Sequence, residues 1–77
     1  MIKVAVFGAK GRMGTAVCQA VEEAEDTELV AAVDSGGDRS DASGADVIVD
    51  FTTPDAVMDN LSWAMSQDIY TVFGTSG

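Results

Sequence analysis

The 77 residues suffice for one small domain but are few for a complete enzyme, and a hydrophobic content of 47% indicates a globular fold rather than disorder. The net charge of −9 argues against nucleic-acid binding, which needs a basic surface, and against binding to an anionic membrane. A single cysteine and the absence of histidine exclude an internal disulfide, a protein zinc site and a Cys–His nucleophile within these residues.

The chain begins with an apolar, valine-rich run at residues 2–7 that leads directly into Gly8. Such a run is typical of a strand buried on both faces of a parallel sheet. It is too short for a signal peptide and has no cleavage pattern. No stretch approaches the ~20 apolar residues of a membrane span, so we expect a cytoplasmic protein.

A helix is predicted from residue 11 to about residue 25. Met13, Val17 and Val21 recur there at helical spacing, and the acidic residues fall on the opposite side or at the exit. The next apolar run, residues 28–33, predicts a second strand.

Residues 35–45 have the composition of a loop; a short helical turn is possible there, but we expect none. Residues 47–49 predict a third strand. Thr53 should cap a second helix, with Pro54 at its first position and an acidic residue in its first turn. Residues 70–73 predict a fourth strand. The inner face of the second helix is expected to consist of Val57, Met58, Leu61, Ala64 and Met65.

Strands that alternate with helices predict an α/β fold, namely a Rossmann-like parallel sheet with flanking helices. Gly8 and Phe51 should flank one crevice, which gives the strand order 2-1-3-4. We expect the methionines and Cys18 to be core residues, whereas Trp63 lies off the apolar stripe of its helix. With no internal repeat or boundary, residues 1–77 are interpreted as one dinucleotide-binding domain, incomplete because a further helix should begin where the chain ends.

Gly8, Gly11 and Gly14 form a G-x-x-G-x-x-G pattern between the first strand and the first helix. Glycines in this position serve a tight turn, the close approach of a pyrophosphate, and the packing of helix on strand. Asp34 follows 20 residues after Gly14 (34 − 14 = 20), at the end of the second strand. It is suited to accept hydrogen bonds from the adenosine ribose, which favours NAD over NADP. The alternatives are a plain tight turn and an ordinary loop or capping aspartate.

Two cations, Lys10 and Arg12, lie within the glycine loop. They are suited to neutralise the pyrophosphate or to meet a 2′-phosphate, the alternative being solvated surface cations. Ligands of open α/β sheets bind beyond the carboxyl ends of the strands. There Phe51 can lie against a flat ring of a ligand, and Thr52 offers a hydroxyl. The alternatives are a core phenylalanine and a capping threonine.

Three segments, VFGAKGRMG at 6–14, VIVDFTTP at 47–54 and GTSG at 74–77, together resemble the N-terminal domain of the dihydrodipicolinate (4-hydroxy-tetrahydrodipicolinate) reductase family. The resemblance covers nearly the whole chain. It implies that NADH or NADPH reduces 4-hydroxy-tetrahydrodipicolinate to tetrahydrodipicolinate in lysine biosynthesis through diaminopimelate, in an enzyme that is a homotetramer when complete. The cofactor-binding residues that we predict from the motifs and the resemblance are Gly8, Ala9, Lys10, Gly11, Arg12, Met13, Gly14, Asp34, Phe51, Thr52, Gly74, Thr75 and Ser76.

The chain departs from the family pattern at Ser76, which replaces a second threonine, and at Ser35, where some members carry an arginine for the NADP phosphate. The family's histidine-rich catalytic segment and substrate domain lie beyond these residues. We therefore assign no catalytic residue and no metal ligand here, expect the 77-residue chain alone to be inactive, and expect use of both cofactors with NADH favoured. The alternatives are another Rossmann dehydrogenase of amino-acid metabolism and a non-catalytic NAD-binding module.

Overall fold

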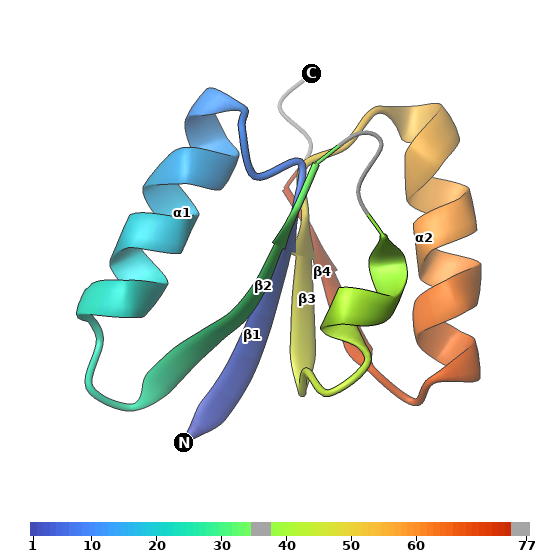
Figure 1. Ribbon diagram of the computed structural model, residues 1–77. Helices are drawn as coiled ribbons and strands as arrows, with labels where there is room; N and C mark the ends of the chain where they lie inside the picture. The colour runs from blue at the N-terminus through green and yellow to red at the C-terminus, as the bar shows by residue number, and fades with distance from the viewer. Residues whose placement is uncertain (35–37, 75–77) are drawn as a thin grey trace.

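The computed structural model describes residues 1–34 and 38–74. Four strands and two α-helices alternate along the chain, with one short 3-10 helix between the second and third strands (Figure 1). In chain order they are β1 (Ile2–Phe7), α1 (Arg12–Glu23), β2 (Thr27–Val33), η1 (Arg39–Ala42), β3 (Val47–Asp50), α2 (Pro54–Ser66) and β4 (Tyr70–Phe73).

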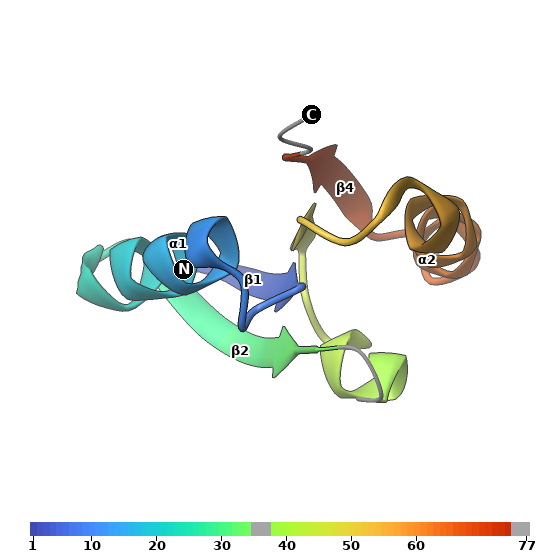
Figure 2. The same cartoon turned by 90° about the horizontal axis from the view of Figure 1, so that it is seen from above.

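The four strands form one parallel sheet in the order β2-β1-β3-β4, which confirms the predicted Rossmann-like architecture and strand order. Figure 2 shows α1 on one face of the sheet, and η1 and α2 on the other. Because all strands run the same way, their carboxyl ends meet at one edge. Every predicted binding residue that the structure describes lies at or near that edge.

Strand β1 lies at the centre of the core because it is paired on both sides. Val4, Ala5, Val6 and Phe7 are all buried, without the alternation of a half-exposed strand. Strand β4 has a partner on one side only among the described residues, and Tyr70 is 72% exposed.

The expectation of no regular element in residues 35–45 was wrong. A 3-10 turn forms at Arg39–Ala42 because the Asp38 side chain caps it, accepting a hydrogen bond from the backbone N–H of Ser40 at 3.0 Å. This backbone hydrogen bond also lowers the pKa of Asp38. The bounds that were predicted for the other elements lie within two residues of the observed ones.

The predicted inner face of α2 was wrong in part. Ala64 is buried as predicted, but Met58 and Met65 are 63% and 68% exposed. Asn60, which was not predicted there, is buried, and Trp63 packs against the core cluster. The helix therefore presents these two methionines to solvent and not to the sheet. The same error holds for the other methionines, since Met1 and Met13 are 78% and 52% exposed.

Candidate functional site

A pocket of 420 Å³ opens at the carboxyl ends of β1, β2 and β3. In parallel α/β sheets this is the edge at which ligands bind. The glycine loop, the end of β2, η1 and the start of α2 contribute its walls. The lining residues are Phe7, Gly8, Gly11, Val33, Asp34, Arg39, Phe51, Thr52, Thr53, Ala56 and Asn60.

The glycine loop is held against the sheet by backbone contacts. Gly8 has a φ of +76°, and its N–H donates to the carbonyl oxygen of Val33 at 2.8 Å. A Cβ on Gly8 would lie 3.0 Å from the carbonyl carbon of Phe51, and one on Gly14 would overlap the carbonyl oxygen of Gly8. These two glycines therefore serve the tight turn and the close packing of α1 on β1.

Gly11 differs from the other two glycines. It is the N-cap residue of α1, with an ordinary φ of −70°, and a Cβ there would make only an ordinary contact of 3.5 Å with the carbonyl oxygen of Gly8. Nothing in the described part of the chain requires a glycine at this position. Gly11 lines the pocket, and α1 begins there without a side-chain cap and without an acidic residue in its first turn. The loop thus leaves room for an anion at the helix N-terminus.

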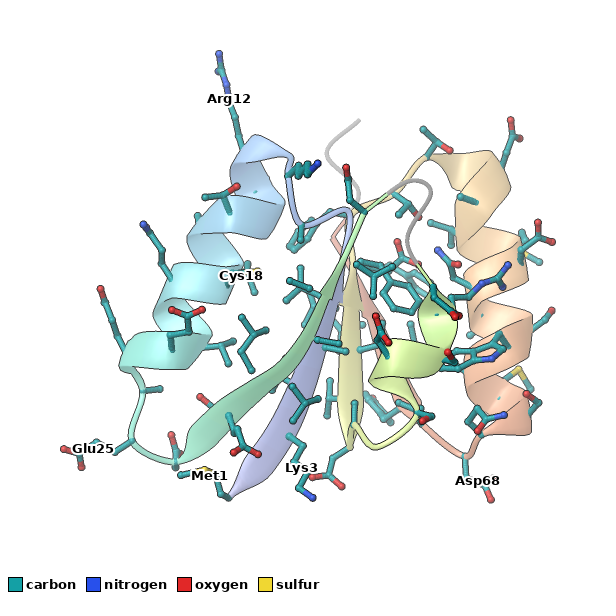
Figure 3. All side chains as sticks on the ribbon, in the orientation of Figure 1. Met1, Lys3, Arg12, Cys18, Glu25 and Asp68 are labelled. Carbon is teal, nitrogen blue, oxygen red and sulfur yellow. The ribbon has the colours of Figure 1, made fainter. Side chains whose placement is uncertain are left out.

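Asp34 lies half-buried at the end of β2 and lines the pocket. Its carboxylate oxygen Oδ2 is 3.9 Å from Nζ of Lys10. Arg12, in contrast, extends from the start of α1 away from the sheet (Figure 3). Of the two cations predicted to act in the loop, only Lys10 is therefore near Asp34.

Arg39 brings a further cation to the pocket, which the sequence interpretation missed. It belongs to η1, and its Nη1 donates to the carbonyl oxygen of Asp59 in α2 at 2.9 Å. This hydrogen bond links the two elements that cover the same face of the sheet. Arg39 lies in a segment with the composition of a loop, so the sequence did not indicate that it reaches the pocket.

A buried polar network lies on the β3–α2 side of the pocket. The fully buried carboxylate of Asp50 accepts hydrogen bonds from the Thr52 backbone N–H at 2.8 Å, from the Thr52 hydroxyl, and from Nδ2 of Asn60 at 3.0 Å. Thr52 and Asn60 line the pocket, whereas Asp50 lies behind them. The sequence interpretation missed Asp50 and Asn60. One local signal could have indicated the turn from Asp50 to Thr52, namely an aspartate that ends a buried strand two residues before a threonine.

Phe51 is half-buried and lines the pocket, so it is more than a core residue. A Cβ on Gly74 would overlap the Phe51 ring, and the Gly74 N–H donates to the carbonyl oxygen of Asp50 at 2.9 Å. The ends of β3 and β4 are thereby packed together. Thr75 and Ser76 lie outside the described residues.

Of the predicted binding residues, Gly8, Gly11, Asp34, Phe51 and Thr52 line the pocket directly. The remaining ones that the structure describes stand around it without lining it, namely Ala9, Lys10, Arg12, Met13, Gly14 and Gly74. Met13 is 52% exposed on α1.

Residues 1–34 and 38–74 give little indication of a metal site, a reactive cysteine or a membrane span. No group of three or more His, Cys, Asp or Glu side chains there could hold a metal ion. Burial, and then the charge of Glu22, raise the pKa of the Cys18 thiol, which makes it a poor nucleophile. No helix in this part of the chain has the length and apolar character needed to cross a membrane.

The chain is similar to known proteins over its whole length. The family model described as "Dihydrodipicolinate reductase, N-terminus" matches residues 2–45 and 38–77. The chain is 94% identical to a 4-hydroxy-tetrahydrodipicolinate reductase of Cutibacterium acnes and 64% identical to one of Thermobifida fusca, and in both cases the match covers 100% of this chain and 31% of the relative. It thus spans about a third of the length of these relatives.

A solved structure shares the fold. It is a dipicolinate-bound dihydrodipicolinate reductase from Paenisporosarcina sp. TG-14, with a TM-score of 0.84 and 24% sequence identity. The match covers 100% of this chain and 38% of that chain. The likeness supports the Rossmann-like architecture independently of the close sequence relatives.

Proposed function

Because this chain belongs to the dihydrodipicolinate reductase N-terminal family, we propose that it binds the nicotinamide dinucleotide in an enzyme that reduces 4-hydroxy-tetrahydrodipicolinate to tetrahydrodipicolinate. This reaction belongs to lysine biosynthesis through diaminopimelate. When bound, the dinucleotide supplies the hydride. The residues of this chain hold and orient it.

One observation carries the proposal. The pocket joins the glycine loop, the uncapped start of α1 and the carboxylate of Asp34 at one edge of the sheet. A pyrophosphate fits beside Gly11, which carries no side chain to block it and where the helix presents free N–H groups. Asp34 is then the acceptor for the ribose hydroxyls of the adenosine. Phe51 and Thr52 lie on the side left for the nicotinamide half.

The family match favours this enzyme over the other Rossmann dehydrogenases that the sequence alone left open. Within the same proposal, both NADH and NADPH are used, and the complete protein is a cytoplasmic homotetramer. Light scattering on the natural protein that carries this chain tests the assembly. Cell fractionation tests the location.

The central test is binding followed by turnover. The natural protein should bind NADH saturably in isothermal titration calorimetry, and addition of 4-hydroxy-tetrahydrodipicolinate should cause loss of the absorbance of reduced nicotinamide. Binding without turnover would indicate a non-catalytic NAD-binding module instead. No binding of either dinucleotide would overturn the proposal.

A further inference from the structure

The hydrogen bonds around Thr52 fix the direction in which its hydroxyl can act. A carboxylate oxygen only accepts, so the Thr52 hydroxyl must donate its single proton to Oδ1 of Asp50. Both oxygens of Asp50 face donors, because the Thr52 backbone N–H lies 2.8 Å from Oδ1 and Nδ2 of Asn60 lies 3.0 Å from Oδ2. The proton of the Thr52 hydroxyl is therefore committed within the protein.

Asn60 is committed in the same way. Its Nδ2 is 3.0 Å from Oδ2 of Asp50 and 3.2 Å from the Thr52 hydroxyl oxygen, so its two N–H groups are both in use. What remains for a ligand is one lone pair on the Thr52 oxygen and the carbonyl oxygen of the Asn60 amide. Since both residues line the pocket, these two side chains can offer it hydrogen-bond acceptors.

We propose that Thr52 recognises a neutral hydrogen-bond donor of the dinucleotide, either a ribose hydroxyl or the carboxamide N–H, and that Asp50 and Asn60 are positioning residues that fix this polarity. The inference rests on the proposed function. A phosphate only accepts hydrogen bonds, so it finds no donor in the Thr52 and Asn60 side chains and binds at the glycine loop instead. These two side chains thereby favour the neutral, hydrogen-bond-donating part of the ligand over its phosphates.

The test compares Thr52→Val with Thr52→Ser in the natural protein that carries this chain. Calorimetry measures the Kd of NADH, of its 3-acetylpyridine analogue, which lacks the carboxamide N–H, and of ADP-ribose, which lacks the nicotinamide. Thr52→Val should weaken NADH about 3- to 10-fold, the worth of one neutral hydrogen bond, while Thr52→Ser restores binding to within about 2-fold. If Thr52→Val raises the Kd of ADP-ribose by the same factor as that of NADH, the donor is a ribose hydroxyl. If it raises the Kd of NADH alone, the donor is the carboxamide.

Two comparisons separate this role from a general loss of structure. Inorganic pyrophosphate should compete with NADH equally well in the original protein and in Thr52→Val. Thr71→Val is the matched control, because Thr71 lies in the same sheet, does not line the pocket, and has a buried hydroxyl with no hydrogen-bond partner among the described residues. It should leave the NADH Kd unchanged.

The positioning role of Asn60 is tested by a double-mutant cycle. Asn60→Ala should weaken NADH binding about 3-fold alone and have little further effect in the Thr52→Val background, because Asn60 acts on the ligand only by orienting Thr52. Independent losses would contradict the positioning role. Suppose that the original protein binds NADH. The inference is then overturned if Thr52→Val leaves the affinity for every ligand unchanged, or if it lowers the affinities for pyrophosphate and NADH by the same factor. If the original protein binds no NADH, the proposed function and this inference fail together.

Discussion

The three glycines of the loop between β1 and α1 differ in what surrounds them. Gly8 has a positive φ and lies against the backbone of Phe51, and Gly14 is in contact with Gly8. Gly11 is open to the pocket. Two of these glycines are therefore explained by the fold itself, and the third is explained by the proposed binding of a dinucleotide in the pocket.

This difference predicts effects of different size on stability for two alanine substitutions. Gly14→Ala should lower the free energy of unfolding by about 2–3 kcal/mol, because its Cβ overlaps the carbonyl oxygen of Gly8 and backbone must shift. Gly11→Ala should change it by less than about 1 kcal/mol, since a weaker N-cap and a less flexible unfolded chain oppose each other. Denaturant unfolding measures both.

Ligand binding separates the same two positions. Gly11→Ala should raise the Kd of NADH about 10-fold or more, because a methyl group then stands where the pyrophosphate approaches. Gly44→Ala is the control, since a Cβ there meets nothing within 4 Å and should alter neither stability nor binding. Unchanged NADH binding by Gly11→Ala would show that the phosphates lie elsewhere.

At the level of elements, the orientation of α2 follows from polar as well as apolar contacts. Asn60 reaches the buried carboxylate of Asp50, and three residues further on Trp63 lies 6.2 Å from the ring of Phe7, centroid to centroid. Together these contacts turn Met58 and Met65 outward. The helix is anchored by a hydrogen bond at one turn and by an aromatic pair at the next.

The orientation of α2 predicts that Trp63 stabilises the fold and that Met65 does not. Trp63→Ala should lower the free energy of unfolding by about 2–3 kcal/mol, less than for a fully buried tryptophan because Trp63 is half-buried. Met65→Ala, at 68% exposure, should change it by less than about 0.5 kcal/mol. Equal effects in denaturant unfolding would mean that the helix presents both residues to the sheet.

Strand β4 carries a separate prediction about stability. The Thr71 hydroxyl is buried without a hydrogen-bond partner among the described residues, and burying an unsatisfied hydroxyl is unfavourable. Thr71→Val should therefore raise the free energy of unfolding by about 1 kcal/mol in thermal or denaturant unfolding. Thr71→Ser, which keeps the hydroxyl, should bring no such gain. A destabilised Thr71→Val would indicate that the hydroxyl has a partner in the natural protein.

The sequence predicted the elements whose signals are local. The four apolar runs, the glycine loop and the start of α2 were all placed correctly because each depends on neighbouring residues. The apolar stripe of α2 was misjudged because Asn60 is polar, and its burial depends on Asp50 ten residues earlier. Arg39 was missed for a similar reason, since only the packing of η1 beside α2 brings it to the pocket.

For the whole molecule, the placement of the few cations matters more than the total charge. The chain carries −9 in net charge and only four Lys and Arg residues. Lys10, Arg12 and Arg39 belong to the glycine loop, the start of α1 and η1, whereas Lys3 lies at the opposite end of the sheet (Figure 3). A dinucleotide is an anion, so an acidic chain repels it except where cations offset the repulsion. This distribution favours approach to the pocket edge.

The same cations bear on the choice between NADH and NADPH. Asp34 should repel a 2′-phosphate and accept hydrogen bonds from free ribose hydroxyls, whereas Lys10, with its Nζ 3.9 Å from Oδ2 of Asp34, can offset that repulsion. The sequence alone suggested both Lys10 and Arg12 for this role, but Arg12 points away from the sheet (Figure 3). We therefore expect Lys10 and Asp34 to discriminate between the cofactors, with both used and NADH somewhat favoured.

Kinetics of the natural protein with each cofactor test this pair. Lys10→Ala should lower kcat/KM for NADPH about 3- to 10-fold more than for NADH, a modest factor because the Lys10 side chain is 84% exposed and solvent screens its charge. Asp34→Ala should lower kcat/KM more for NADH, since the ribose hydroxyls lose their acceptor while the repulsion of the 2′-phosphate disappears. Arg12→Ala is the matched control and should affect both cofactors alike. If Arg12→Ala shifted the NADPH-to-NADH ratio and Lys10→Ala did not, Arg12 would be the discriminating cation, and its side chain would have to turn toward the pocket when the cofactor binds.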